Sequence, residues 1–180
     1  MNLNFQTLQG PFSINVEPAK GEWFLRILSK ISIHQQPHLS LQAIKADYEA
    51  AGLEDFGENA DGSYDWDVYL LGDGITINSS TPVGQGATIY LDLNTNSADG
   101  LVAGTYTYAN ERAPFTWVFA DACASFNTSN FSCASGSYNA SAGTVVISGS
   151  GNNTTIEVNL TDTSGASITA SYTGGFSIID

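Results

Sequence analysis

Residues 143–173, GTVVISGSGNNTTIEVNLTDTSGASITASYT, contain three runs of alternating apolar and polar residues, separated by turn-forming segments at 149–152 and 162–165. A period of two places successive side chains on opposite faces of a strand, and glycine, asparagine and aspartate favour tight turns. The stretch therefore predicts a three-stranded antiparallel meander, with Phe176 and Ile178 as candidates for a fourth strand at its edge. The side chains expected to face the core are those of Val145, Ile147, Ile156, Val158, Leu160, Ile168, Ala170 and Tyr172.

The same alternation recurs upstream of the meander. Apolar residues occupy every second position in 66–70 and in 89–93, and aromatic residues do so in 106–108 and 115–119. Roughly eight to ten strands in one chain must close or stack in order to bury one face and protect their edges. The sequence thus predicts an all-β protein, an antiparallel meander that forms a β-barrel or a two-sheet sandwich.

One short helix is expected near residues 40–52. Residues 22–33 alternate as a long strand, but beyond them the apolar residues fall on one helical face. Ser40 suits the amino-terminal cap of such a helix, and Gly52 suits its carboxyl-terminal cap.

The length of 180 residues suits a single domain. We therefore expect one β domain over residues 1–180. It would consist of a strand-and-helix segment at 1–60 and the antiparallel meander at 61–180.

The charge of the chain is strongly acidic, with 18 Asp and Glu against 5 Lys and Arg. Residues 1–45 sum to +2 and residues 46–180 to −15, where Arg112 is the only cation. Such a surface repels phosphate backbones and anionic membranes, so nucleic acid is not expected as a partner. The faintly basic amino-terminal segment could dock on an acidic partner or on a second copy, which leaves a homo-oligomer open.

The cysteine content bears on the compartment. Cys123 and Cys133, the only two, lie ten residues apart in a polar stretch and would form a disulfide in an oxidising compartment; two free thiols are the alternative. No apolar run is long enough to span a bilayer, and the first 30 residues lack the pattern of a signal peptide. We expect either an extracytoplasmic protein (cell surface, periplasmic or secreted) or a virion-surface protein.

Four segments resemble a known family. They are GTYTY at 104–108, GTVVISGSG at 143–151, IEVNLTDTSG at 156–165 and ITASYTG at 168–174. Over about residues 65–175 the chain is similar to calycin-like β-barrel domains of exported Bacteroidetes proteins. The resemblance implies a cell-surface or periplasmic barrel, and it carries no functional residues with it.

Conventional catalytic and metal-binding patterns are weak. His34 and His38 have the spacing of a helical zinc pair, but Pro37 interrupts a helix there and no further ligand is near in sequence. A serine triad would need one of these histidines, and the chain contains no G-x-S-x-G motif. No metal, cofactor or catalytic residue is therefore assigned, and the protein is not expected to be an enzyme.

Carboxylates crowd in residues 54–67, a stretch that suits a solvated loop, an irregular calcium site or a pair of catalytic carboxylates. Asn59 and Asp61 suggest an irregular calcium loop, although the position of its bidentate glutamate is not acidic. Asp65 and Asp67 would share one strand face at about 7 Å, a spacing that glycosidase carboxylates can have.

These features favour a non-catalytic, exported or surface-displayed β domain that binds a small ligand, a glycan or a protein. Its recognition residues are predicted to be Tyr106, Tyr108 and Trp117, since aromatic rings give a large contact area at small entropic cost. The alternative for these rings is that they belong to the core. The alternative function is a structural subunit of an assembly, such as a virion or a filament.

Overall fold

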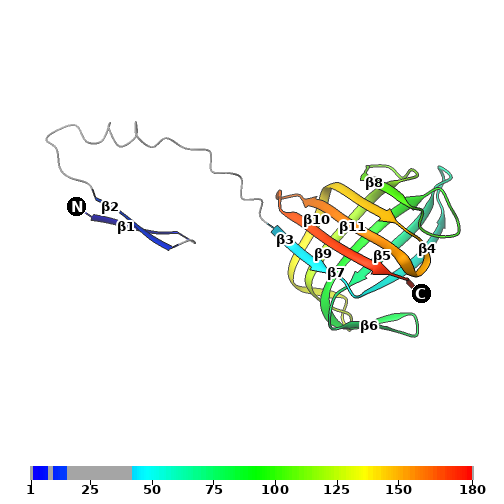
Figure 1. Cartoon of the computed structure of the whole chain (residues 1–180), viewed down its shortest axis with the longest axis horizontal. Helices are drawn as coiled ribbons and strands as arrows, with labels where there is room; N and C mark the ends of the chain where they lie inside the picture. The colour runs from blue at the N-terminus through cyan, green and yellow to red at the C-terminus, as the bar shows by residue number, and fades with distance from the viewer. Residues whose placement is uncertain (1, 8–9, 16–41, 180) are drawn as a thin grey trace. The chain divides into compact units, whose positions relative to one another are not determined.

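Figure 1 shows the computed structural model of the chain, which describes residues 2–7, 10–15 and 42–179. The chain divides into two compact units, residues 1–39 and 40–180, which are described separately. The first contains a two-stranded antiparallel sheet of β1 (Asn2–Thr7) and β2 (Gly10–Asn15). The strand predicted at 22–33 and the histidines His34 and His38 lie outside the described residues.

The second unit consists almost entirely of strands, which confirms the all-β prediction. The strands are β3 (Gln42–Asp47), β4 (Ala50–Glu58), β5 (Tyr64–Leu71), β6 (Ile75–Asn78), β7 (Thr81–Thr95), β8 (Gly104–Tyr108), β9 (Thr116–Asn127), β10 (Ser132–Ser148), β11 (Thr154–Asp162), β12 (Ser167–Gly174) and β13 (Ser177–Ile178). The only helical element of the described residues is the single 3-10 turn η1 at Gly151–Asn153. None of the helical structure described is long and apolar enough to cross a bilayer.

The strands form one mixed sheet in the order β13-β4-β5-β7-β9-β8-β10-β11-β12-β3, with β6 paired to the start of β7. Although β3 and β4 lie near opposite ends of this order, only Tyr48 and Glu49 separate them in the chain. The backbone N–H of Tyr48 donates to Ser171 of β12, and that of Glu49 donates to Leu71 of β5. The sheet therefore rolls into a barrel-like form that is not closed by a ladder between β3 and β4 (Figure 1).

The predicted meander is present as β10, β11 and β12, and all eight of its predicted core side chains are buried. They pack inside the roll with alternate residues of the other strands, such as Val68 of β5 and Leu91 of β7. Full burial of a side chain of this size contributes roughly 1.5–3 kcal/mol. A slip of one residue in register would expose the whole set, so burial fixes which side chains face outward.

The helix predicted at residues 40–52 is corrected by the structure, because the described part of this range forms strands. β3 pairs in parallel with β12, and β4 pairs with β5. Tyr48 and Ala51 are buried, as a helical face would have required. However, an isolated helix of about 12 residues is marginal in water, whereas ladders to two neighbouring strands satisfy the same backbone groups within the core. β3 and β4 thus belong to the same sheet as the meander.

Candidate functional site

The outward face of β5, β7 and β9 carries polar and aromatic side chains in rows. The alternation that turns Trp66 and Val68 toward the core turns the intervening residue Asp67 outward. Antiparallel register then aligns outward residues across the three strands. One row is Asp67, Asp92 and Phe119, and the next is Tyr69, Tyr90 and Asp121.

An acidic cluster, defined by Asp65, Asp67 and Asp92 together with Arg112, occupies one end of this face. Arg112 extends from the loop between β8 and β9, and its guanidinium lies 2.6 Å from the carboxylate of Asp65. It also donates hydrogen bonds of 2.8 and 2.7 Å to the two carboxylate oxygens of Asp92. One oxygen from each aspartate lies within 4.8 Å of the others, a donor set that suits a hard cation. In the acidic cluster Arg112 supplies the positive charge, so the arrangement is an ion-pair network.

Burial controls the protonation of two members of this cluster, Asp67 and Asp92. It raises the pKa of Asp67 to about 7, and the hydrogen bond of 2.6 Å from Tyr90 only partly opposes this effect. Burial also raises the pKa of Asp92 to about 6, helped by the charge of Asp65 and opposed by Arg112. Asp67 therefore exchanges its proton near neutral pH.

The glycosidase hypothesis for Asp65 and Asp67 gains little support from this geometry. The two carboxylates do share one strand face, but the residues are only 8% and 5% exposed. Both carboxylates of a glycosidase must reach the scissile bond. Their contacts with Arg112 and Tyr90 instead favour a structural role. Asp61, suggested for a calcium loop, accepts hydrogen bonds from Ser63 in the turn between β4 and β5.

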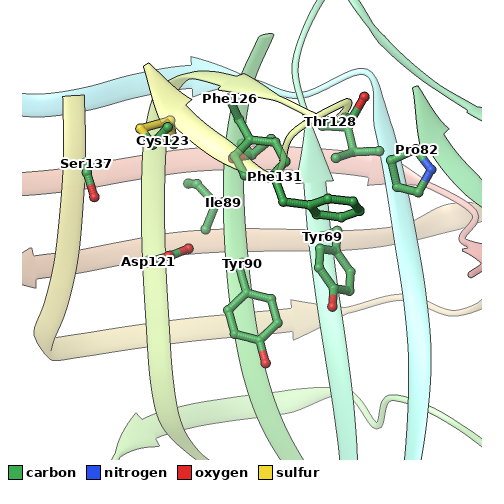
Figure 2. A pocket seen from close by; sticks show the side chains of 13 residues that line it. Tyr69, Pro82, Ile89, Tyr90, Asp121, Cys123, Phe126, Thr128, Phe131 and Ser137 are labelled. Atoms are coloured by element: carbon green, nitrogen blue, oxygen red, sulfur yellow. A yellow bond between two sulfur atoms is a disulfide. The ribbon is translucent and has the colours of Figure 1, made fainter. Parts of the chain in front are cut away.

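Beside the acidic cluster, the outward face forms the floor of a cavity of about 380 Å³, which we call the outer pocket (Figure 2). This volume lies in the range of small-molecule sites, roughly 300–1,000 Å³. The lining is mainly apolar and aromatic. The lining includes Tyr69, Tyr90, Asp121, Phe126, Phe131 and Ser137.

One wall of the outer pocket forms where the β6–β7 hairpin meets the turn between β9 and β10. The hydroxyl of Thr128 accepts a hydrogen bond of 2.9 Å from the Gly84 N–H and donates one of 3.0 Å to the Gly84 carbonyl. Gly84 has a φ of 129°, and a Cβ at this position would collide with the carbonyl of Gly74. Only glycine therefore lets the two strands of the β6–β7 hairpin approach each other this closely.

The predicted disulfide between Cys123 and Cys133 is confirmed, with a Cα–Cα distance of 5.8 Å. It links β9 to β10 at the outer pocket, and both cysteines line the pocket. The bond therefore holds together the two strands whose connecting turn forms part of the wall.

Phe131 lies at this turn and is 81% exposed, the largest exposure among the described large apolar residues. Its φ of 50° is in the left-handed region, which a bulky side chain rarely adopts and which costs on the order of 1–3 kcal/mol. The ring lies edge-on to Phe126 at a centroid distance of 6.4 Å. Strain that presents an exposed aromatic ring beside a cavity is a recognised indication of function.

The polar groups of the outer pocket differ in whether they already have a hydrogen-bond partner. The Tyr69 hydroxyl donates to Glu54 at 3.0 Å, and the Tyr90 hydroxyl donates to Asp67. Asp121 is half-buried, and among the residues that the structure describes its carboxylate has no hydrogen-bond partner. Burial raises the pKa of Asp121 above its ordinary value.

The three residues predicted for recognition lie elsewhere. Tyr106 and Trp117 are fully buried in the core, where the Tyr106 hydroxyl donates to the Val102 carbonyl at 2.8 Å. Tyr108 is 41% exposed and packs on Trp117 at a centroid distance of 4.7 Å. Of the three, only Tyr108 presents its ring to solvent, because the other two positions face inward.

Sequence reasoning missed Asp92, Asp121 and Arg112. A signal was present for the aspartates, because each interrupts an apolar strand pattern at an outward position. Arg112 stands out in the sequence only as the single cation after residue 45. Its pairing depends on a loop whose path the pattern does not specify.

Comparisons with protein-family models, curated proteins and solved structures find no match for this chain. The similarity to calycin-like barrels therefore stays a prediction.

Proposed function

We propose that this protein is a non-catalytic binding domain that takes a small ligand into the outer pocket. The observation that carries the proposal is the pocket itself, a cavity of about 380 Å³ on the sheet with Phe131 exposed beside it. The interior of the roll is filled by the core, so a ligand site is expected on its outer face.

The chemistry of the lining supports the same proposal. Tyr69, Tyr90, Phe126 and Phe131 offer apolar surface, and aromatic rings provide much contact area with few rotatable bonds. A ligand inserted between the sheet and the hairpins would bury these rings, which supplies a hydrophobic driving force. The acidic cluster next to the pocket would fix the positions of Tyr90 and of the strand that carries it.

The disulfide supports the proposed location. Disulfides form and persist in oxidising compartments, and the bond between Cys123 and Cys133 lies at the proposed site. We therefore propose that the domain acts outside the cytoplasm.

A screen of small aromatic, amine and saccharide compounds by thermal shift, followed by calorimetry, tests the proposal. Phe131→Asn removes the ring and leaves a residue that tolerates the left-handed backbone, so folding should be retained and affinity should fall by about tenfold. Ser137→Trp should abolish binding by filling the pocket. The matched control is Phe56→Asn, which changes an exposed phenylalanine that does not line the pocket. Equal losses in Phe131→Asn and the control, or no ligand at all, would overturn the proposal.

A structural subunit remains a second candidate, because of the amino-terminal unit. Among the described residues, β1 and β2 pair only with each other, and a two-stranded sheet is marginally stable by itself. A strand from a second copy could extend it. Light scattering on the full chain distinguishes the two functions, since a large homo-oligomer would favour the assembly and a monomer the binding domain.

A further inference from the structure

Building on the proposed function, we infer that the ligand of the outer pocket is an apolar cation, in which an aromatic or branched hydrocarbon group carries a protonated amine that pairs with Asp121.

The position of Asp121 is the first reason. It lies on β9 between the buried residues Ala120 and Ala122, so its side chain points outward into the outer pocket. Register places it opposite Tyr90 on β7 and opposite Asn139 on β10. Asp121 is thus flanked on both sides by strands, and Figure 2 shows Asp121 and Ser137 on neighbouring strands along one side of the pocket.

The second reason is that Asp121 is the carboxylate without a partner in this pocket. The hydroxyls of Tyr69, Tyr90 and Thr128 are already engaged in hydrogen bonds. A half-buried carboxylate without a donor is unfavourable, and the raised pKa of Asp121 reflects this burial. An ammonium group that enters the pocket would relieve this cost by forming a charge-assisted hydrogen bond.

The third reason is the negative charge around the outer pocket and the aromatic rings that line it. Of the described residues that line the outer pocket, none is Lys, Arg or His. Residues 46–180 carry a charge of −15, so the local potential attracts cations and repels anions. The rings of Tyr69, Tyr90 and Phe131 would contact the hydrocarbon part, and their faces also attract an ammonium group.

Three probes of nearly equal shape separate charge from apolar contact: 1-naphthylmethylamine, 1-naphthalenemethanol and 1-naphthoate. Calorimetry with the full chain at neutral pH should show the amine binding about tenfold more tightly than the alcohol, and no binding of the carboxylate. Asp121→Asn should bring the amine to within about threefold of the alcohol and leave the alcohol unchanged. Glu157→Gln, the same charge change at an exposed position of β11, should alter neither affinity.

Ser137→Lys provides an independent variant, because it places a positive charge at the edge of the pocket. It should weaken the amine more than the alcohol. If Asp121→Asn does not fold, this variant alone decides the preference for a cation.

Failure of this inference is distinguishable from failure of the proposed function. If amine and alcohol bind equally and both depend on Phe131, the outer pocket is a ligand site and the inference is wrong. If none of the three probes binds, the inference is also wrong, and the broader screen with Phe131→Asn decides the proposed function.

Discussion

Arg112 donates hydrogen bonds to both carboxylate oxygens of Asp92, at 2.8 and 2.7 Å, although the two residues lie twenty positions apart in the chain. Bidentate pairs of this kind combine charge with fixed geometry. The contribution of this pair to the stability of the fold should lie between that of an exposed ion pair and that of a buried one. The Arg112 side chain is 35% exposed, and that of Asp92 only 9%.

Replacement of Arg112 by methionine should therefore destabilise the fold by about 2–3 kcal/mol, because Asp65 and Asp92 would stay buried without a cation. Urea denaturation measures the loss. Arg112→Lys should recover part of the lost stability, because lysine supplies a point charge but cannot form the paired hydrogen bonds. A loss below about 0.5 kcal/mol for methionine would contradict a stabilising role of the network.

Stability should increase when the pH is lowered from about 8 to about 5. The pKa of Asp67 is about 7 in the folded protein, above the value of roughly 3.9 in an unfolded chain, and that of Asp92 is about 6. Between pH 5 and pH 8 the folded state binds more protons than the unfolded state. Stability is therefore lost as the pH rises through the pKa values of the folded protein.

The measurement is urea denaturation across this pH range, with an expected change of about 4 kcal/mol, since each pH unit below the folded pKa of Asp67 or Asp92 contributes about 1.4 kcal/mol. Asp67→Asn should remove most of the dependence, whereas Glu157→Gln, at an exposed position, should retain it. If the stability of Asp67→Asn depends on pH as steeply as that of the natural protein, the pH dependence arises from the general negative charge of the chain and not from Asp67.

Loss of the disulfide should cost about 2–3 kcal/mol in the chain-entropy model. The comparison is between the natural protein and a Cys123→Ala, Cys133→Ala double variant, by urea denaturation without reductant. Because the disulfide lies at the outer pocket, ligand affinity should fall as well. Two readily alkylated thiols in protein from its native compartment would show that the bond does not form there.

Trp117→Ala should cost about 3–5 kcal/mol of stability, as should Tyr106→Ala, because both rings are fully buried. Tyr108→Ala should cost less than about 1.5 kcal/mol, since this ring is partly exposed. Thermal and chemical unfolding of the three variants checks the ranking. If Tyr108→Ala folds normally but weakens binding of a ligand found in the screen, the recognition predicted for Tyr108 would hold independently of the outer pocket.

The meander could be predicted because its strands are neighbours in sequence and its turns contain glycine, asparagine and aspartate. β3 could not, because its partner β12 lies far along the chain and its local pattern also suits a helix. For the acidic cluster, alternation placed Asp65 and Asp67 on one face, but only the register of β5 against β7 brings Asp92 beside Asp67. That register depends on the intervening β6–β7 hairpin.

The outer pocket was beyond prediction for a related reason. Its wall depends on the contact of Thr128 with Gly84, and these residues lie 44 positions apart. Neither residue stands out in the sequence, because threonine and glycine are common throughout the turns. The pocket is a property of how two hairpins fold over a sheet, which no local pattern records.

The junction of β3 and β4 places two consecutive strands under different timing during synthesis, because β3 pairs with β12, which is made much later. Gln42 is made early but pairs with Ser167, so β3 must wait for nearly the whole of the second unit to leave the ribosome. Until then the growing chain carries an unpaired strand, and non-local pairings of this kind form slowly. A nascent or truncated chain that lacks β12 would expose β3 to other molecules, because an unpaired strand edge is a template for pairing with another chain.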